Sequence, residues 1–192
     1  RISRIFPSYY RFLQELLGAE DVHLLLTHPH QENTIRQAID QPHTRYDRLR
    51  IHHIPSNDAW ARDHGPTFLT KAQSKALINW DYNAWGGKYP PYHLDDQIPL
   101  KIALLQDLPH FQPNLILEGG AIDTNGQGTL LTTASCLLNP NRNPGITQDK
   151  MEEILHNYLG AEQVIWLQGQ LIGDDTDGHI DQIARFVGPD TV

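Results

Sequence analysis

The feature that most constrains this 192-residue chain is a glycine-containing polar segment that follows or adjoins a short apolar run and occurs three times. Trp85-Gly86-Gly87, Glu118-Gly119-Gly120 and Asp177-Gly178-His179 lie at comparable intervals. Glycine permits tight turns and a close approach of the backbone to another group, so each segment predicts a sharp turn beside a strand. The recurrence indicates one structural unit used several times, although the units share too little sequence to prove a repeat.

Short apolar runs alternate with helical periodicities, which predicts an α/β chain. We expect helices over residues 8–17 and 31–40. A third helix would begin at Asp95 and Asp96 as caps and run to about residue 108. A fourth would lie between the N-cap Thr147 and Gly160. We expect strands over residues 22–26, 48–54, 67–69, 76–82, 115–117, 129–132, 163–167 and 180–187. No low-complexity stretch or obvious linker interrupts the pattern, so we expect a single domain over residues 1–192.

Composition narrows the class of partner. The chain carries 15 basic and 23 acidic residues, a net charge of −8, which argues against nucleic acid or an anionic membrane as the main partner and suits a small cationic substrate. One cysteine, Cys136, excludes an internal disulfide and permits a reducing compartment. No apolar run is long enough to cross a bilayer, and residues 1–7 lack the apolar core of a secretory signal, so we expect a cytoplasmic protein.

Four segments combine polar residues with glycine or aromatic residues: 57–66, 79–87, 117–123 and 173–181. In the last segment, His179 and Asp181 would share one face of a strand, where an imidazole and a carboxylate can cooperate in proton transfer. The spacing alone favours a simpler interpretation, an Asp- and Gly-rich turn before an exposed strand. Glu118 at a strand end and Asp63 beside Arg62 likewise have ordinary interpretations, a solvated terminus and a turn or ion pair.

Two further residue types are open to more than one interpretation. Trp60, Trp80 and Trp85 could wall a pocket for a flat cation, or belong to the core. Cys136 has the chemistry of a nucleophile, but a lone cysteine at the end of an apolar strand is more often a small buried hydrophobic residue, and we expect that here.

Taken together, the segments resemble the family of agmatine deiminases and bacterial peptidyl-arginine deiminases. The matching stretches, in the order of that family, are NDAWARDHGPT (57–67), NAWGG (83–87), LEGGAID (117–123), TTASCLLNPNRNP (132–144) and DTDGHID (175–181). Each is modest alone, but five in order are specific. The resemblance therefore favours functional roles for Asp63, Glu118, His179 and Asp181 over the ordinary interpretations. His64 departs from the small polar residue that the family often carries there.

The resemblance implies a pentein-type α/β propeller of ββαβ-like units around a central channel, of which this chain would hold about three of five. It also implies that an opening segment and a C-terminal Gly-rich segment with the catalytic cysteine lie outside residues 1–192. Cys136 matches a different segment, so the role of nucleophile is not transferred to it. Members of this family often associate, and a homo-oligomer is one of the states we consider.

By the same resemblance, the activity is hydrolysis of a guanidine, with agmatine giving N-carbamoylputrescine and ammonia on the way to putrescine. Asp63, Glu118 and Asp181 would be the acidic positions, with Glu118 or Asp63 paired with Asp181 around the guanidinium nitrogens. His179 would protonate the departing ammonia and deprotonate water after a cysteine thiolate has formed a thiouronium. The resemblance also places Trp60 and Asp58 at the substrate, and requires no metal or organic cofactor.

Other functions are compatible with the residues. Peptidyl-arginine is an alternative substrate within the family, and a catalytically inactive guanidinium-binding fragment is an alternative to an enzyme. A metal-dependent hydrolase would use the run Asp174, Asp175, Asp177, His179 and Asp181 as hard ligands, but no second ligand set accompanies that run.

Overall fold

The computed structural model describes residues 4–169 and 171–192, and these form two compact units, Arg1–Ser56 and Asn57–Val192. Each unit is described by itself. The start of the opening segment, residues 1–3, lies outside the described residues. The expectation of a single domain over the whole chain stays a prediction.

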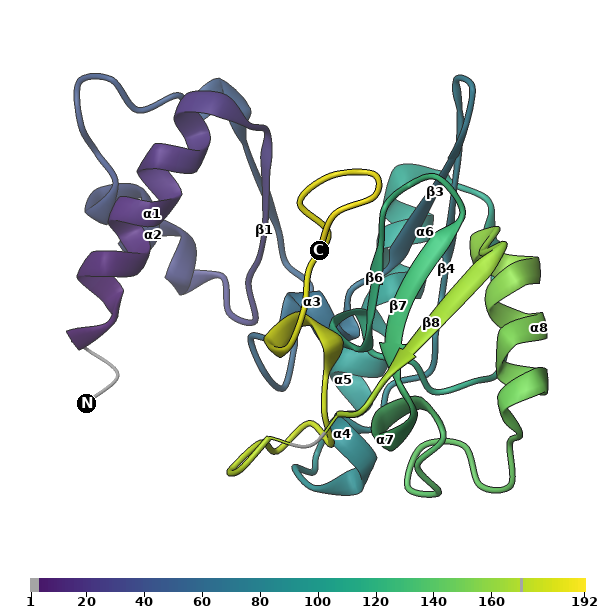
Figure 1. Ribbon diagram of the computed structural model, residues 1–192. Helices are drawn as coiled ribbons and strands as arrows, with labels where there is room; N and C mark the ends of the chain where they lie inside the picture. Colours follow the sequence, from purple (N-terminus) through teal and green to yellow (C-terminus); the bar gives the residue numbers. More distant parts are fainter. Residues whose placement is uncertain (1–3, 170) are drawn as a thin grey trace. The chain divides into compact units, whose positions relative to one another are not determined.

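Unit 1 packs two helices against a pair of strands (Figure 1). Helices α1 (Phe6–Ala19) and α2 (His30–Ala38) pack against the strands β1 (Val22–Leu25) and β2 (Leu49–His52), which pair in parallel with Val22 opposite Leu49. Pro7 in the first turn favours the start of α1 because proline fixes a helical φ. The core of unit 1 is apolar and consists of Leu13, Leu17, Leu26, Ile35, Ile39 and Leu49.

Unit 2 contains two three-stranded sheets. In the first, β3 (Thr67–Lys71) pairs antiparallel with β4 (Ser74–Ile78), and β4 pairs in parallel with β5 (His110–Phe111). The helices α5 (His93–Asp96) and α6 (Ile98–Gln106) lie between β4 and β5 in the chain, so they make the crossover that a parallel pair requires. The short helices α3 (Ala61–His64) and α4 (Ala84–Gly87) precede and follow the β3–β4 hairpin.

In the second sheet, β6 (Ile122–Thr124) pairs antiparallel with β7 (Thr129–Thr133), and β7 pairs in parallel with β8 (Gln163–Leu167). The crossover contains α7 (Ala134–Leu137) and α8 (Gln148–Leu159), and α8 runs beside this sheet (Figure 1). Met151 and Leu155 on α8 are fully buried and share one core cluster with Leu130 on β7. The Thr147 hydroxyl caps α8 by accepting from the amide of Lys150, and Gly160 ends it at φ +66°.

The structure confirms several predicted elements. The predicted helices over 8–17, 31–40 and 147–160 and the strands over 22–26, 48–54, 67–69, 129–132 and 163–167 correspond to α1, α2, α8, β1, β2, β3, β7 and β8. Strand β4 ends at Ile78, short of the predicted 82. Gly18 lies inside α1 and does not end it.

Three predictions of secondary structure were wrong. Residues 115–117 form no strand: only an isolated bridge joins Asp81 and Ile116, and β6 takes the place beside β7. Asp95 and Asp96 lie within α5 and bind more distant backbone amides, so they do not cap the helix that follows. Residues 180–187 are no strand, because the amides of Gln182, Ile183 and Ala184 bond to nearby carbonyls and Ile180–Gln182 forms a 3-10 helix, η4.

The described residues form three small sheets, one in unit 1 and two in unit 2. The α/β class is therefore confirmed, and the propeller arrangement stays a prediction. None of the helices formed by residues 4–169 and 171–192 is long and apolar enough to cross a membrane.

Candidate active site

A buried carboxylate, Asp63, marks one side of the site. Asp63 lies in the single turn of α3 and is 7% exposed. Its Oδ2 accepts a hydrogen bond from the Trp85 indole at 3.2 Å, and its Oδ1 accepts one from the Gly120 amide at 3.1 Å. Burial raises the pKa of Asp63 to about 6, with these two hydrogen bonds acting against the rise. At neutral pH the side chain is a carboxylate that has given up most of its hydration.

The two glycines after Glu118 allow other groups to approach the backbone closely. A Cβ on Gly119 would lie 2.0 Å from the carbonyl oxygen of Arg62. A Cβ on Gly120 would lie 2.5 Å from His179 Nδ1, 2.6 Å from Asp63 Oδ1 and 2.9 Å from Asp181 Oδ2. The side chains of three predicted site residues therefore lie against the backbone of Gly120.

His179 is 1% exposed, and its Nδ1 lies 3.6 Å from Asp63 Oδ1. The preceding loop holds it there: Asp174 accepts from the amides of Thr176 and Gly178, and the Thr133 hydroxyl donates to the Gly178 carbonyl. Burial lowers the pKa of His179 to about 4. The ring is neutral at pH 7, so it is able to accept a proton.

Asp181 completes the cluster from η4. One ligand atom from each of Asp63, His179 and Asp181 lies within 4.8 Å of the others. Burial raises the pKa of Asp181, while the charges of Arg185 and Arg62 act in the opposite direction. The prediction that His179 and Asp181 share a face through a strand was wrong about the strand, yet the 3-10 turn brings both side chains to the same place.

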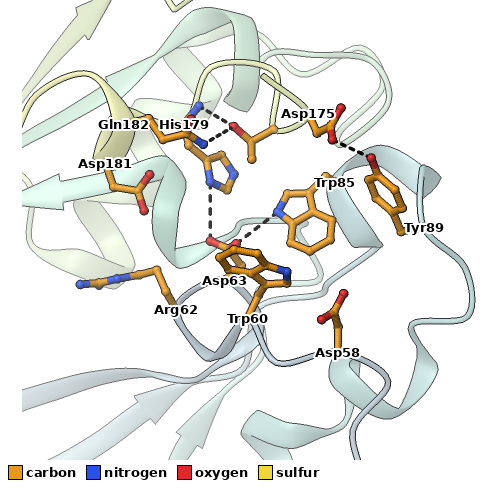
Figure 2. A pocket seen from close by; sticks show the side chains of 11 residues that line it. Asp58, Trp60, Arg62, Asp63, Trp85, Tyr89, Asp175, His179, Asp181 and Gln182 are labelled. Atoms are coloured by element: carbon orange, nitrogen blue, oxygen red, sulfur yellow. Dashed lines mark hydrogen bonds and ion pairs between the residues drawn. The ribbon is translucent and has the colours of Figure 1, made fainter. Parts of the chain in front are cut away.

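A cavity of about 580 Å³ opens over this cluster (Figure 2). Trp60, which is 58% exposed, lies in front of Asp63 in this view, and the indole of Trp85 is hydrogen-bonded to Asp63. In this view Asp181 and Arg62 lie on one side, while Asp58 and the hydrogen-bonded pair Tyr89 and Asp175 lie on the other. The lining residues are Asp58, Trp60, Arg62, Asp63, Trp85, Tyr89, Asp175, Thr176, His179, Asp181 and Gln182.

Of the three tryptophans considered as pocket walls, Trp60 and Trp85 line the cavity, whereas Trp80 is buried in the core. The sequence singled out Asp58, Trp60, Asp63, His179 and Asp181, and all five line one cavity. It attached no role to Gly120 or Tyr89. Gly120 was at least signalled by the double glycine after a carboxylate.

Glu118 is placed differently. It is 0% exposed, does not line the cavity, and its Oε1 accepts a hydrogen bond from Arg142 Nε at 2.7 Å. Its Oε2 and the Nε2 of His179 are both buried without a partner among the described residues. Glu118, His179 and Cys136 each offer an atom within 4.8 Å of the other two, so Glu118 lies behind the imidazole. Burial raises the pKa of Glu118, and Arg142 opposes this rise.

Two groups of side chains in the described part of the chain could hold a metal ion: Asp63 with His179 and Asp181, and Glu118 with Cys136 and His179. Neither group is the set of ligands between Asp174 and Asp181 that the metal-dependent hydrolase alternative would use. Asp174 instead accepts the loop bonds described above, and Asp177 binds Lys88 and Arg142. Cys136 is fully buried, as predicted, and burial raises the pKa of its thiol.

An acid-lined cavity with an aromatic wall and one neutral imidazole is chemically suited to a small cation and to proton transfer. The sequence pattern of the Porphyromonas-type peptidyl-arginine deiminase matches residues 1–192, so the chain belongs to that family.

Relatives and solved structures agree with this assignment. A Legionella pneumophila (strain Paris) protein provisionally named agmatine deiminase is 46% identical over 186 residues, which are 96% of this chain and 52% of that protein. The agmatine deiminase of Pseudomonas syringae pv. tomato is 39% identical over 168 residues, 84% of this chain and 44% of that protein. The agmatine deiminase structure of Enterococcus faecalis matches with a TM-score of 0.83 and 29% identity, over 98% of this chain and 50% of that one. The chain thus spans about half the length of the relatives it matches.

Proposed function

We propose that the full-length protein hydrolyses a guanidine to a ureido group and ammonia. The main observation behind this proposal is that the side chains of Asp63, His179 and Asp181 meet beside Gly120 and line one cavity. A guanidinium is planar, permanently charged and rich in N–H donors, so two carboxylates beside each other are its natural partners. A neutral imidazole between them supplies the proton transfer that breaking a C–N bond requires.

The carboxylates that grip the guanidinium are Asp63 and Asp181 in this proposal. Both line the cavity, whereas Glu118 is buried behind it and already binds the guanidinium of Arg142. In this proposal, Glu118 lies on the side of His179 away from the cavity, and its negative charge stabilises the imidazolium when it forms. This choice replaces the wider set of Glu118 or Asp63 with Asp181 that the family resemblance implied.

The chemistry needs a nucleophile that Cys136 does not supply, because its thiol is fully buried and lines no part of the cavity. We place the attacking cysteine outside residues 1–192. His179 accepts the proton of that thiol, and the thiolate adds to the guanidinium carbon. The imidazolium then protonates one amino group, which leaves as ammonia when its C–N bond breaks.

The remaining thiouronium is hydrolysed in the second half of the reaction. Water adds to the same carbon while His179 takes its proton, and the C–S bond breaks to release the ureido product and the thiolate. A solved Campylobacter jejuni agmatine deiminase carries a cysteine-to-serine change and has substrate bound. It matches 97% of this chain at 30% identity and a TM-score of 0.85, and a bound substrate in a cysteine variant agrees with cysteine as the nucleophile.

Agmatine is the substrate that the cavity favours. Its guanidinium would lie at Asp63 and Asp181, and its distal ammonium would lie on the side where Asp58 and Asp175 add negative charge. Trp60 is exposed at the cavity and suits the aliphatic chain between the two cations. The product would be N-carbamoylputrescine, a precursor of putrescine. A peptidyl arginine carries no second cation at the corresponding distance, so it would not use Asp58.

The test is ammonia release from agmatine by the full-length protein. We expect His179→Asn to lower kcat by about a thousandfold, because general acid–base catalysis contributes on that scale. His110→Asn, on the exposed strand β5, is the matched control and keeps the rate of the unmodified protein. Residues 1–192 alone would bind agmatine without turnover. Equal rates for the two histidine variants would refute the assignment of His179.

A further inference from the structure

Arg142 is a fully buried cation in the segment NPNRNP, and its guanidinium reaches two separate parts of the site. Nε donates to Glu118 Oε1 at 2.7 Å. Nη1 donates to Asp177 Oδ2, and Nη2 donates to the carbonyl of Thr176 at 3.0 Å. Arg142 therefore joins the segment that carries Glu118 to the loop that precedes His179.

That loop has a backbone that requires support. Asp177 has φ +64°, a left-handed conformation that is costly for a residue with a side chain, and Gly178 follows at φ +96°. A Cβ on Gly178 would lie 2.2 Å from the carbonyl oxygen of Gly169, so the chain is held tightly there. His179 comes directly after these two residues, and its position depends on how they are held.

Three donors fix the Asp177 carboxylate. Besides Arg142, Lys88 Nζ lies 2.7 Å from Oδ1, and Asn141 Nδ2 lies 3.0 Å from Oδ2. Lys88 directly follows NAWGG and Asn141 belongs to NPNRNP. Neither residue lines the catalytic cavity, yet both bind the loop before the imidazole. Arg142 is the one of the three whose side chain also contacts Glu118.

We propose that Arg142 is the positioning residue of the site: it fixes Glu118 and His179 relative to each other and holds the imidazole over Asp63. This inference rests on the proposed role of His179 in guanidine hydrolysis. Arg142 lines no part of the catalytic cavity, so in this proposal it acts through Glu118 and through the loop before His179.

The charge of Arg142 matters as well as its shape. After burial, its repulsion of the imidazolium is the largest cause that lowers the pKa of His179, and Lys88 acts in the same direction. Asp174 and Asp177 oppose them. The carboxylates of Asp63, Glu118 and Asp181 and the thiol of Cys136 are further ionisable groups beside the ring. Removal of the guanidinium is therefore expected to raise the pKa of His179 as well as to release its loop.

A purely structural ion pair is the rival explanation, because a buried pair also affects stability when one partner is removed. Two comparisons separate the explanations. Leu155→Ala opens a cavity in the core on α8 and lowers the melting temperature at a residue that does not line the catalytic cavity, so it controls for lost stability. Arg142→Lys keeps the charge but cannot bind Glu118, Thr176 and Asp177 together, so it separates charge from geometry.

The experiment uses the full-length protein with agmatine. We expect Arg142→Met to lower kcat about a hundredfold with KM changed less than about threefold, because a displaced imidazole loses rate while the substrate contacts remain. Arg142→Lys should lose about tenfold. Leu155→Ala should keep kcat within about twofold at an equal loss of melting temperature. NMR titration of the His179 ring should show a higher midpoint pH in Arg142→Met and a smaller change in Arg142→Lys.

The proposal is overturned if Arg142→Met retains the kcat of the Leu155→Ala control and leaves the His179 titration unchanged. If Arg142→Met does not fold, the comparison of Arg142→Lys with Asp177→Asn, which removes the charge that Arg142 binds, decides on the same two readouts. An unmodified protein that releases no ammonia would instead refute the proposed function, and the His179 titration would still report on Arg142.

Discussion

The two units differ in what they bury. Among the described residues of Arg1–Ser56, the buried side chains are apolar, and the ion pairs Glu32–Arg36 and Asp47–Arg45 are at least partly exposed. In Asn57–Val192, nine of the described residues are polar or charged and buried: Asp63, His64, Asn79, Asp95, Glu118, Thr132, Thr133, Arg142 and His179.

Burial of a charge costs stability unless close partners compensate for it. Unit 1 avoids that cost and has the side-chain distribution of a simple packed core. Unit 2 accepts it at several places, and one of them is the buried pair Glu118–Arg142 with the partly unpartnered His179 beside the cavity. A departure from the best packing is expected where function, and not stability, selects the residue. The contrast assigns the site to unit 2 without any reference to relatives.

The largest effect that would sharpen this contrast comes from removing one glutamate charge in each unit. Glu118→Gln leaves Arg142 buried with only Asp177 as its ionic partner, so we expect a loss of about 3 kcal/mol in the free energy of unfolding. Glu32→Gln breaks an exposed pair with Arg36 and should cost less than about 1 kcal/mol. Urea denaturation of the full-length variants measures both. Losses of similar size would mean that the buried pair is no different from a surface pair.

A second comparison uses one glycine from each unit. Gly120→Ala places a methyl group against His179, Asp63 and Asp181, so we expect kcat/KM to fall about a hundredfold. Gly18→Ala, inside helix α1 with nothing near the added atom, should stabilise the protein by roughly 0.5–1 kcal/mol and leave the rate unchanged. Steady-state kinetics and thermal unfolding test the opposite signs. An active Gly120→Ala protein would contradict the arrangement of the site.

Elements that depend on local chemistry were predictable from the sequence. The Thr147 cap, the periodic Met151 and Leu155, and Gly160 define α8 without any other part of the chain. Residues 180–187 were mispredicted because their apolar pattern suits a strand, while the backbone bonds that decide the matter close a 3-10 turn at Ile180. Propensity is a weak guide where the chain must deliver side chains to a site.

The site was predictable as a set of residues but not as an arrangement. Asp63, His179 and Asp181 were selected through the family resemblance, and spacing alone favoured ordinary roles for them. Their meeting at Gly120 depends on contacts across 57 or more residues of the chain, which no local pattern encodes. The partner of Glu118 was missed for the same reason: Arg142 lies 24 residues away in a segment without a recognisable chemical role.

The smallest effect concerns a histidine pair in unit 1. His23 Nδ1 and His52 Nε2 lie 2.9 Å apart in nearly parallel rings, on the paired strands β1 and β2. One ring nitrogen must donate and the other accept, so two protonated rings would set N–H against N–H. Burial, then the charge of His23, lowers the pKa of His52 below 6.5.

The unfolded chain therefore binds a proton at His52 at higher pH than the folded chain does. The stability that this group contributes is present above pH 6.5 and is lost as the pH falls through its folded pKa. In the unmodified protein, we expect the β1 and β2 amides to lose protection from hydrogen exchange between pH 7 and pH 5. His52→Asn should make this loss smaller, by less than about 1 kcal/mol in the free energy of opening, because the pair is partly solvated. Native-state hydrogen exchange at both pH values measures it, with the exposed His43→Asn as the control. If both variants lose protection as much as the unmodified protein, the pair is not a source of acid sensitivity in unit 1.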